Sequence, residues 1–89
     1  MPRVLVVDGN AIDRLLTQSL LEAGGYAADA AIDASHAVEW LTGRRRYGLV
    51  IIGGGDSGCE CVETARRIRA IGGHAARLPI LALAAPLAD

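Results

Sequence analysis

The sequence predicts a single α/β domain, a three-layer structure in which helices cover both faces of a parallel sheet. Apolar runs that suit buried strands alternate with stretches of helical spacing, in the order strand, helix, strand, helix, strand, helix, strand. The links between them are short, which favours parallel pairing of successive strands through crossover helices. The length of 89 residues fits one domain over residues 1–89.

The first strand and the first helix occupy residues 3–23. Arg3–Val7 is a continuous apolar run after its first residue, and Asp8 with Gly9 ends it. Asn10 is a favourable N-cap for the helix that follows. That helix carries an apolar stripe at helical spacing, and glycines at 24 and 25 end it; the stripe consists of Ile12, Leu15, Leu16, Leu20 and Ala23.

The second strand and helix are less distinct. Residues 26–32 form an alanine-rich strand that we expect near an edge of the sheet. Asp33 or Ser35 caps the second helix, which ends at Gly43. Its inward side chains are expected to be Ala37, Trp40 and Leu41.

The last predicted elements follow a basic turn at residues 44–47. Leu49–Ile52 is the third strand, and a glycine loop leads from it into a third helix over about Cys59–Ile71. The apolar stripe of that helix is Val62, Ala65, Ile68 and Ile71. Leu78–Leu83 is the fourth strand, and residues 84–89 form a tail.

Composition argues against several classes of protein. A net charge of -1 offers no basic face for nucleic acid. No apolar run approaches the roughly 18 residues that suggest a membrane span, and Met1-Pro2-Arg3 leads directly into a strand, so we expect a cytoplasmic protein. Cys59 and Cys61 lie too close in sequence to staple a fold, and on a helix they diverge too far to share a metal.

Four segments resemble the receiver domains of two-component response regulators: Val4–Asn10, Ala31–Ala34, Tyr47–Ile52 and Leu78–Ala85. The stretch Glu63–Arg69, followed by two glycines, is especially similar to the receivers attached to hybrid histidine kinases. The resemblance runs through the whole chain in register but covers only about the first three quarters of a typical receiver. It implies the flavodoxin-like topology with strand order 2-1-3-4, without the fifth strand and the last helix.

The resemblance also implies where phosphotransfer would take place. Receivers use two acids after the first strand, an acceptor aspartate at the end of the third strand, a hydroxyl after the fourth and a lysine on the fifth. The acids hold Mg²⁺, and the metal ion and the lysine neutralise the charge that develops on the transferred phosphoryl group. Here Asp8 matches the first acid, while Gly9, Gly53 and Ala84 occupy the next three positions, and all nine basic residues are arginine. We therefore expect no catalytic residue, no Mg²⁺ and no enzymatic activity. The expected function is that of a degenerate receiver-like domain, a phosphorylation-independent interaction or regulatory module in a phosphorelay.

Three motifs leave alternatives open. Asp56 is a possible alternative acceptor, although a turn or helix cap also explains an aspartate there. The glycines of the 53–58 loop formally match a dinucleotide fingerprint, so the alternative function is a small-ligand or nucleotide-binding module. The next strand, however, ends without the acid that would hold a ribose. The run Arg44–Arg46 could contact an anionic partner, but a short basic run in a turn is typical of solvated surface.

The fourth strand is predicted to form an exposed apolar edge. Such edges pair with other segments, so we expect this one and the tail after it to bind a partner. The residues expected to do so are Leu78, Ile80, Leu81, Leu83, Pro86 and Leu87. The expected partner is a histidine kinase, a neighbouring domain, or a second copy in a homodimer or domain swap, and the first helix is the next candidate surface. Neither nucleic acid nor a membrane is expected as a partner.

Overall fold

The computed structural model describes residues 2–53 and 59–83, and it confirms the predicted α/β architecture. One parallel sheet contains four strands in the order β2-β1-β3-β4, which is the order that the resemblance implies. The strands are β1 (Arg3–Val7), β2 (Ala28–Ala31), β3 (Tyr47–Gly53) and β4 (Ile80–Leu83).

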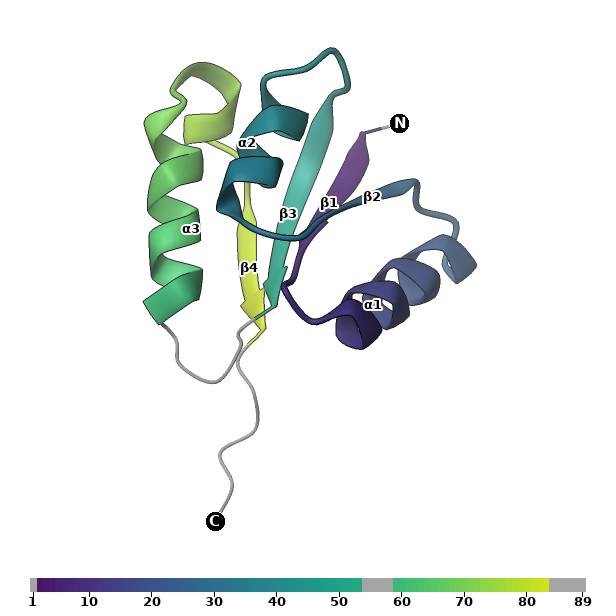
Figure 1. The fold of residues 1–89 in the computed structure, drawn as a ribbon. Coiled ribbons are helices and arrows are strands. Elements are labelled where there is room, and N and C mark those ends of the chain that lie inside the picture. Colours follow the sequence, from purple (N-terminus) through teal and green to yellow (C-terminus); the bar gives the residue numbers. More distant parts are fainter. Residues whose placement is uncertain (1, 54–58, 84–89) are drawn as a thin grey trace.

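The helices are distributed over both faces of the sheet. They are α1 (Ala11–Ala23), α2 (Ala34–Leu41), α3 (Cys59–Ala70) and a short 3₁₀ helix, η1 (Gly73–Ala76), that the sequence pattern does not predict. Helices α2 and α3 lie together on one side of the sheet, and α1 lies apart from them against β1 and β2 (Figure 1). None of the helices in residues 2–53 and 59–83 has the length and apolar character that crossing a membrane requires.

Local signals explain where the helices begin and end. Asn10 caps α1, because its side-chain oxygen accepts hydrogen bonds from the backbone N–H groups of Ile12 and Asp13, both at 3.0 Å. Asp33, rather than Ser35, caps α2, since its carboxylate accepts from the His36 N–H at 2.9 Å. Gly72 follows α3 with a φ of 81°, a conformation that glycine adopts without steric cost.

The core lies between the sheet and the α2–α3 layer. Leu5 pairs with Val50 and Val7 with Ile52 across β1 and β3, so these four side chains point to the same face. They pack with Ala37 of α2 and Ile68 of α3, as the sequence predicts for those helices. Trp40 also packs against this core, and its indole N–H donates to the Ala30 carbonyl at 3.1 Å, which confirms that it covers the sheet.

Two expectations about buried and exposed side chains are wrong. Leu78 is only 1 % exposed and belongs to the core, so it is not part of an exposed edge. The reason is that β4 begins only after Pro79, and the chain that leaves η1 places Leu78 under α3 before the strand starts. On α3, Val62 is exposed, and Cys61 and Thr64 are buried beside Ile68 in its place. Ala65, Ile68 and Ile71 of the predicted stripe do pack against the core, so the prediction for α3 is wrong only at Val62.

The apolar stripe of α1 faces away from the sheet. The half-buried side of this helix carries Arg14, Thr17, Gln18 and Leu21. Gln18 donates from its side-chain amide to the Ala28 carbonyl at 3.0 Å, and Arg14 donates to the Asp8 carbonyl at 2.9 Å. Polar contacts to the strand backbone thus hold α1 to the sheet, while the leucines and isoleucine opposite them remain in solvent.

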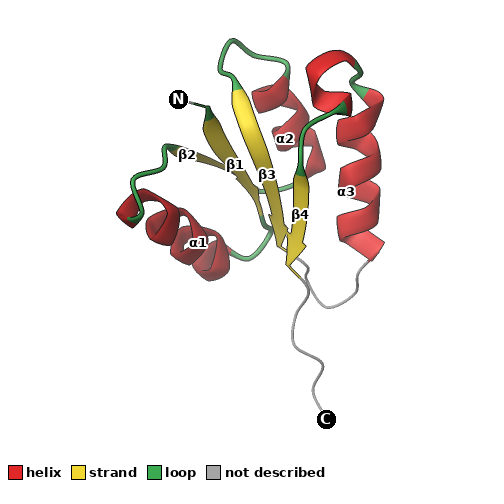
Figure 2. Cartoon of the chain, turned by 180° about the vertical axis from the view of Figure 1, so that it is seen from behind, coloured by secondary structure: helices red, strands yellow, loops and turns green. Residues whose placement is uncertain are grey.

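The strand β4 adds two more exposed apolar side chains on the α1 side of the sheet. Leu81 pairs with Ile51 and Leu83 with Gly53, so both point to the face opposite the α2–α3 core. Figure 2 shows α1 on one side of the sheet, apart from α2 and α3. We call Leu81, Leu83 and the stripe of α1 together the open face, because both groups lie on the same side of the sheet. Its six members are between 43 % and 78 % exposed: Ile12, Leu15, Leu16, Leu20, Leu81 and Leu83.

Candidate functional site

The predicted phosphotransfer position lies where β1 and β3 end. Val7 pairs with Ile52, so Asp8 and Gly53, the residues that follow, lie side by side at the carboxyl edge of the sheet. This edge is where open parallel sheets usually bind ligands. A cavity of about 430 Å³ opens there, and its lining includes Asp8, Gly9, Gly53, Asp33, Thr64 and Arg67.

The Asp8 carboxylate fills the space beside Gly53. A Cβ atom built on Gly53 would overlap the Oδ2 and Cγ atoms of Asp8, so the two positions cannot both carry a side chain in this arrangement. The other carboxylate oxygen, Oδ1, accepts a hydrogen bond from the Asn10 N–H at 2.9 Å, which fixes the orientation of the group. The one acid of the predicted set therefore occupies the space into which a side chain at residue 53 would project.

Arg14 brings a positive charge to the same corner. Its guanidinium Nη1 donates to the Asp8 backbone carbonyl at 2.9 Å. Guanidinium groups keep their charge at any physiological pH, so this is a permanent cation against the backbone of Asp8. No motif in the sequence singles out Arg14; its position on the helix face opposite the apolar stripe is the signal that could have identified it.

Helices α2 and α3 contribute the rest of the cavity wall. Arg67 donates from Nη2 to the Ser35 hydroxyl at 3.1 Å and so bridges the two helices over the cavity. Asp33 caps α2 with its carboxylate, and Glu63 is solvent-exposed. Within residues 2–53 and 59–83, no group of three or more His, Cys, Asp or Glu side chains is arranged to hold a metal ion.

Several predicted site residues lie outside the described part of the chain. These are Asp56 and the glycine loop at 54–58, and Ala84, Pro86 and Leu87 in the tail. Of the proposed partner-binding residues that the structure does describe, Leu81 and Leu83 are exposed, Ile80 is partly buried against the core and Leu78 is buried. Only Leu81 and Leu83 are thus positioned as an exposed edge predicts.

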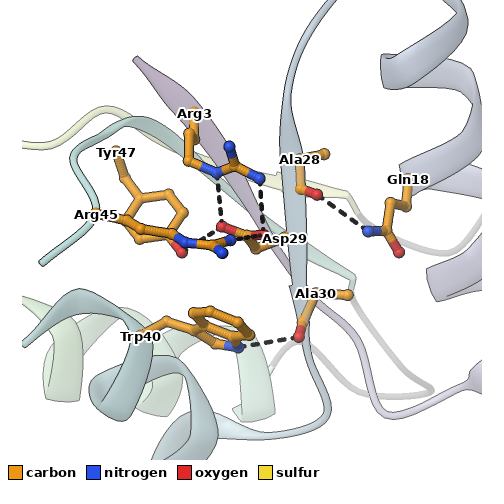
Figure 3. Close-up of polar contacts among 8 residues, drawn as sticks. All are labelled: Arg3, Gln18, Ala28, Asp29, Ala30, Trp40, Arg45 and Tyr47. Atoms are coloured by element: carbon orange, nitrogen blue, oxygen red, sulfur yellow. Dashed lines mark hydrogen bonds and ion pairs between the residues drawn. The ribbon is translucent and has the colours of Figure 1, made fainter. Parts of the chain in front are cut away.

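A buried polar cluster lies at the opposite, amino-terminal end of the strands. The Asp29 carboxylate accepts hydrogen bonds from Arg3 at 2.9 and 3.0 Å, from Arg45 at 2.7 Å and from the Tyr47 hydroxyl at 2.6 Å (Figure 3). The Arg45 guanidinium also lies 5.4 Å from the centre of the Trp40 ring, a cation–π contact. The cluster therefore connects β1, β2, β3 and the turn before β3.

The cluster changes the acidity of two of its members. Burial of the Asp29 carboxyl raises its pKa, but hydrogen bonds from Arg3, Tyr47 and Arg45 outweigh that effect and lower the pKa from 3.8 to about 2. Burial, and then the hydrogen bond to Asp29, raises the pKa of Tyr47. Asp29 is thus a charged side chain with its acceptors satisfied, which marks a structural ion cluster rather than a reactive carboxylate.

Comparison with known proteins gives a consistent result at the level of structure. No family model matches the chain, and no curated protein sequence matches it. Among solved structures, a response regulator receiver protein from Pseudomonas putida is 34 % identical, with a TM-score of 0.76, and the match covers 93 % of this chain and 67 % of that one.

Other solved structures extend the comparison. A sensor protein from Polaromonas sp. JS666 is 25 % identical with a TM-score of 0.81, and the match covers 96 % of this chain and 66 % of that one. The response regulator protein TrrA from Thermotoga maritima, solved in complex with Mg²⁺-BeF, is 35 % identical with a TM-score of 0.62, over 80 % of this chain and 61 % of that one.

The chain spans 61 % to 67 % of the lengths of these three proteins, which is less than the three quarters expected from the sequence. The strand order, the position of Asp8 and Gly53 at the carboxyl edge of the sheet, and the identity to the Pseudomonas receiver agree with one another. This chain therefore belongs to the response regulator receiver family.

Proposed function

We propose that this receiver domain works without phosphotransfer, as a protein-interaction module of two-component signalling in the cytoplasm. In this proposal it is not an enzyme and does not carry a phosphoryl group. It transmits a signal, or holds an assembly together, through the surfaces that it presents to a histidine kinase, a neighbouring domain or a second copy.

The observation that carries the proposal is the pairing of Gly53 with Asp8. An acceptor must present a nucleophilic oxygen at the end of β3, and glycine has none. The space that such a side chain would need holds the Asp8 carboxylate, which the Asn10 N–H anchors. Two features of the pocket, a missing nucleophile and an occupied space, thus argue in the same direction.

The residues at this corner fit a magnesium ion poorly. Magnesium binds an octahedral set of oxygens that usually includes one or two carboxylates, and here Asp8 is the acid that follows β1 while Gly9 replaces a second one. The Oδ1 atom of Asp8 is already hydrogen-bonded, and the Arg14 guanidinium lies against the carbonyl of the same residue. A dication placed there would be repelled by that guanidinium, so we propose that the domain uses no metal cofactor.

The open face is the surface that we propose for protein binding. Monomeric proteins rarely expose several large apolar side chains on one side, and such patches commonly mark interaction sites. Among the residues that the structure describes, β4 also has no strand along its outer edge, so its backbone hydrogen-bonding groups are available there. An apolar helix of a partner would pack along Leu15 and Leu16, and a strand of the same partner would pair with β4.

Phosphoryl transfer is tested most simply by intact-mass spectrometry. The chain is incubated with acetyl phosphate and Mg²⁺, and TrrA from Thermotoga maritima, which was solved in complex with Mg²⁺-BeF, is treated in parallel as the positive control. We expect the control to gain a phosphoryl group and this chain to gain none. The same comparison with a cognate kinase as donor covers the case in which a small donor reacts too slowly.

An Asp56→Asn variant makes the result specific. If the wild-type chain is phosphorylated and the variant is not, Asp56 is the acceptor and phosphorylation independence is refuted. Phosphorylation of both chains on an aspartate or glutamate would refute it as well. Phosphorylation of neither chain, with an active positive control, supports the proposal.

A further inference from the structure

A second cavity lies at the amino-terminal end of the strands, on the opposite side of the domain from Asp8 and Gly53. Its volume is about 310 Å³, which is within the range of small-molecule sites. The turn before β3, the end of α2 and the η1 region form its walls, and its lining includes Leu41, Arg44, Arg45, Arg46, Ile71 and His74.

The lining of this cavity carries positive charge and no carboxylate. Three consecutive arginines and one histidine belong to the lining, and no Asp or Glu does among the residues that the structure describes. His74 lies with Nε2 at 2.9 Å from the Tyr47 carbonyl, and since a carbonyl only accepts, this nitrogen carries the hydrogen.

The arginines differ in what they already bind. Arg45 pairs with Asp29 and stacks over Trp40, which places its guanidinium firmly at the edge of the cavity. Arg3 also forms an ion pair with Asp29, so the negative charge of Asp29 is already neutralised by Arg3 and Arg45 and does not require Arg44 or Arg46. Arg44 and Arg46 are exposed and form no ion pair within residues 2–53 and 59–83. Their charges are therefore available to an anion.

The cavity also has an apolar side. Leu41 and Ile71 line it and are only partly buried, so a ligand that entered would cover apolar surface as well as charged surface. A free inorganic ion would use the arginines alone. A molecule with a phosphate at one end and a ring or hydrocarbon portion at the other would use both parts, because guanidinium groups match phosphate oxygens in geometry and charge.

We propose that this cavity binds a small organic phosphate, with the phosphate on Arg44 and Arg46 and the organic portion against Leu41 and Ile71. The site is separate from the phosphotransfer corner and does not depend on whether Gly53 disables it. It gives the basic turn a binding function, where the sequence alone favoured solvated surface.

The test is a titration of the ¹⁵N-labelled 89-residue chain with adenosine monophosphate, inorganic phosphate and adenosine, followed by NMR. We expect adenosine monophosphate to cause saturable shifts in the amides of residues 44–47 and 72–75. Inorganic phosphate should shift the same amides with weaker affinity, and adenosine should cause no saturable shift. The double variant Arg44→Gln/Arg46→Gln should weaken binding by about tenfold or more, since a hydrogen bond to a charged group is worth about 1.5 kcal/mol and tenfold corresponds to about 1.4 kcal/mol.

A control variant with the same change in net charge distinguishes a specific binding site from non-specific electrostatic attraction. Arg66 and Arg77 are exposed and do not line the cavity, so Arg66→Gln/Arg77→Gln removes the same charge elsewhere. The control should leave the affinity unchanged within about twofold, an effect below 0.5 kcal/mol. Equal weakening by the two double variants, no saturable shift up to about 10 mM ligand, or shifts centred on Asp8 instead would overturn the proposal.

Discussion

Replacing Asp29 with asparagine should destabilise the domain in a way that depends on pH. The carboxylate accepts four hydrogen bonds from Arg3, Arg45 and Tyr47, and these lower its pKa from 3.8 to about 2. One pKa unit corresponds to about 1.4 kcal/mol, so the charged form contributes about 2 kcal/mol to the free energy of unfolding at neutral pH. Asparagine keeps the size of the side chain and removes that contribution.

The sign of the pH dependence follows from the depressed pKa. Between the two values the unfolded chain binds a proton at Asp29 and the folded chain does not, so stability rises with pH in that interval. The contribution is fully present above about pH 4 to 5, about half of it is lost near pH 3, and little remains at pH 2. The difference between wild type and Asp29→Asn should therefore be about 2 kcal/mol at pH 7 and shrink towards zero at pH 2.

Urea denaturation followed by circular dichroism, at pH values from 7 down to 2, measures this difference directly. Glu39→Gln is the control, because Glu39 is exposed on α2, lies outside the first turn of that helix and forms no ion pair within residues 2–53 and 59–83. Its effect should stay below about 0.5 kcal/mol. If Asp29→Asn costs the same free energy at pH 2 as at pH 7, the ion cluster is not the source of the stability and the reasoning is refuted.

Three further changes test other parts of the account. Gly53→Ala should lower the free energy of unfolding by about 1 kcal/mol in thermal or urea denaturation, because the new Cβ atom overlaps the Asp8 carboxylate. This loss should vanish when Asp8 is also replaced by alanine, and an unchanged loss in that background would contradict the contact. Leu16→Gln on the open face should reduce self-association, measured by sedimentation equilibrium, and should change the free energy of unfolding by less than about 0.5 kcal/mol. A wild-type chain that is monomeric at high micromolar concentration would count against a second copy as the partner. Asn10→Ala should lower the free energy of unfolding by about 1 kcal/mol through loss of the α1 cap, whereas Asn10→Asp should keep most of it.

The sequence was sufficient for the order of elements and for the core strands. Continuous apolar runs such as Leu5–Val7 and Val50–Ile52 identify strands that are covered on both faces, and they pair as expected. Helical spacing located α1 correctly but could not decide which side meets the sheet. That depends on Arg14 and Gln18, whose hydrogen bonds to the carbonyls of Asp8 and Ala28 compete with burial of the leucines.

The polar cluster could not be derived from local patterns. Asp29 lies 26 residues from Arg3 and 18 from Tyr47, so only the folded sheet brings them together. An aspartate inside a strand is unfavourable by propensity, and that alone could have marked the position as unusual. The overlap of Asp8 with the space beside Gly53 likewise depends on the register of β1 and β3, whereas the glycine at position 53 is visible in the sequence.

The central claim is that the corner formed by Asp8 and Gly53 does not capture a phosphoryl group with its metal ion. The most direct measurement is an NMR titration of the labelled chain with Mg²⁺ and beryllofluoride, which imitates a bound phosphoryl group. We predict no saturable shift in the amides of residues 8–10 and 51–53. A saturable shift at those amides that requires both Mg²⁺ and beryllofluoride would contradict it.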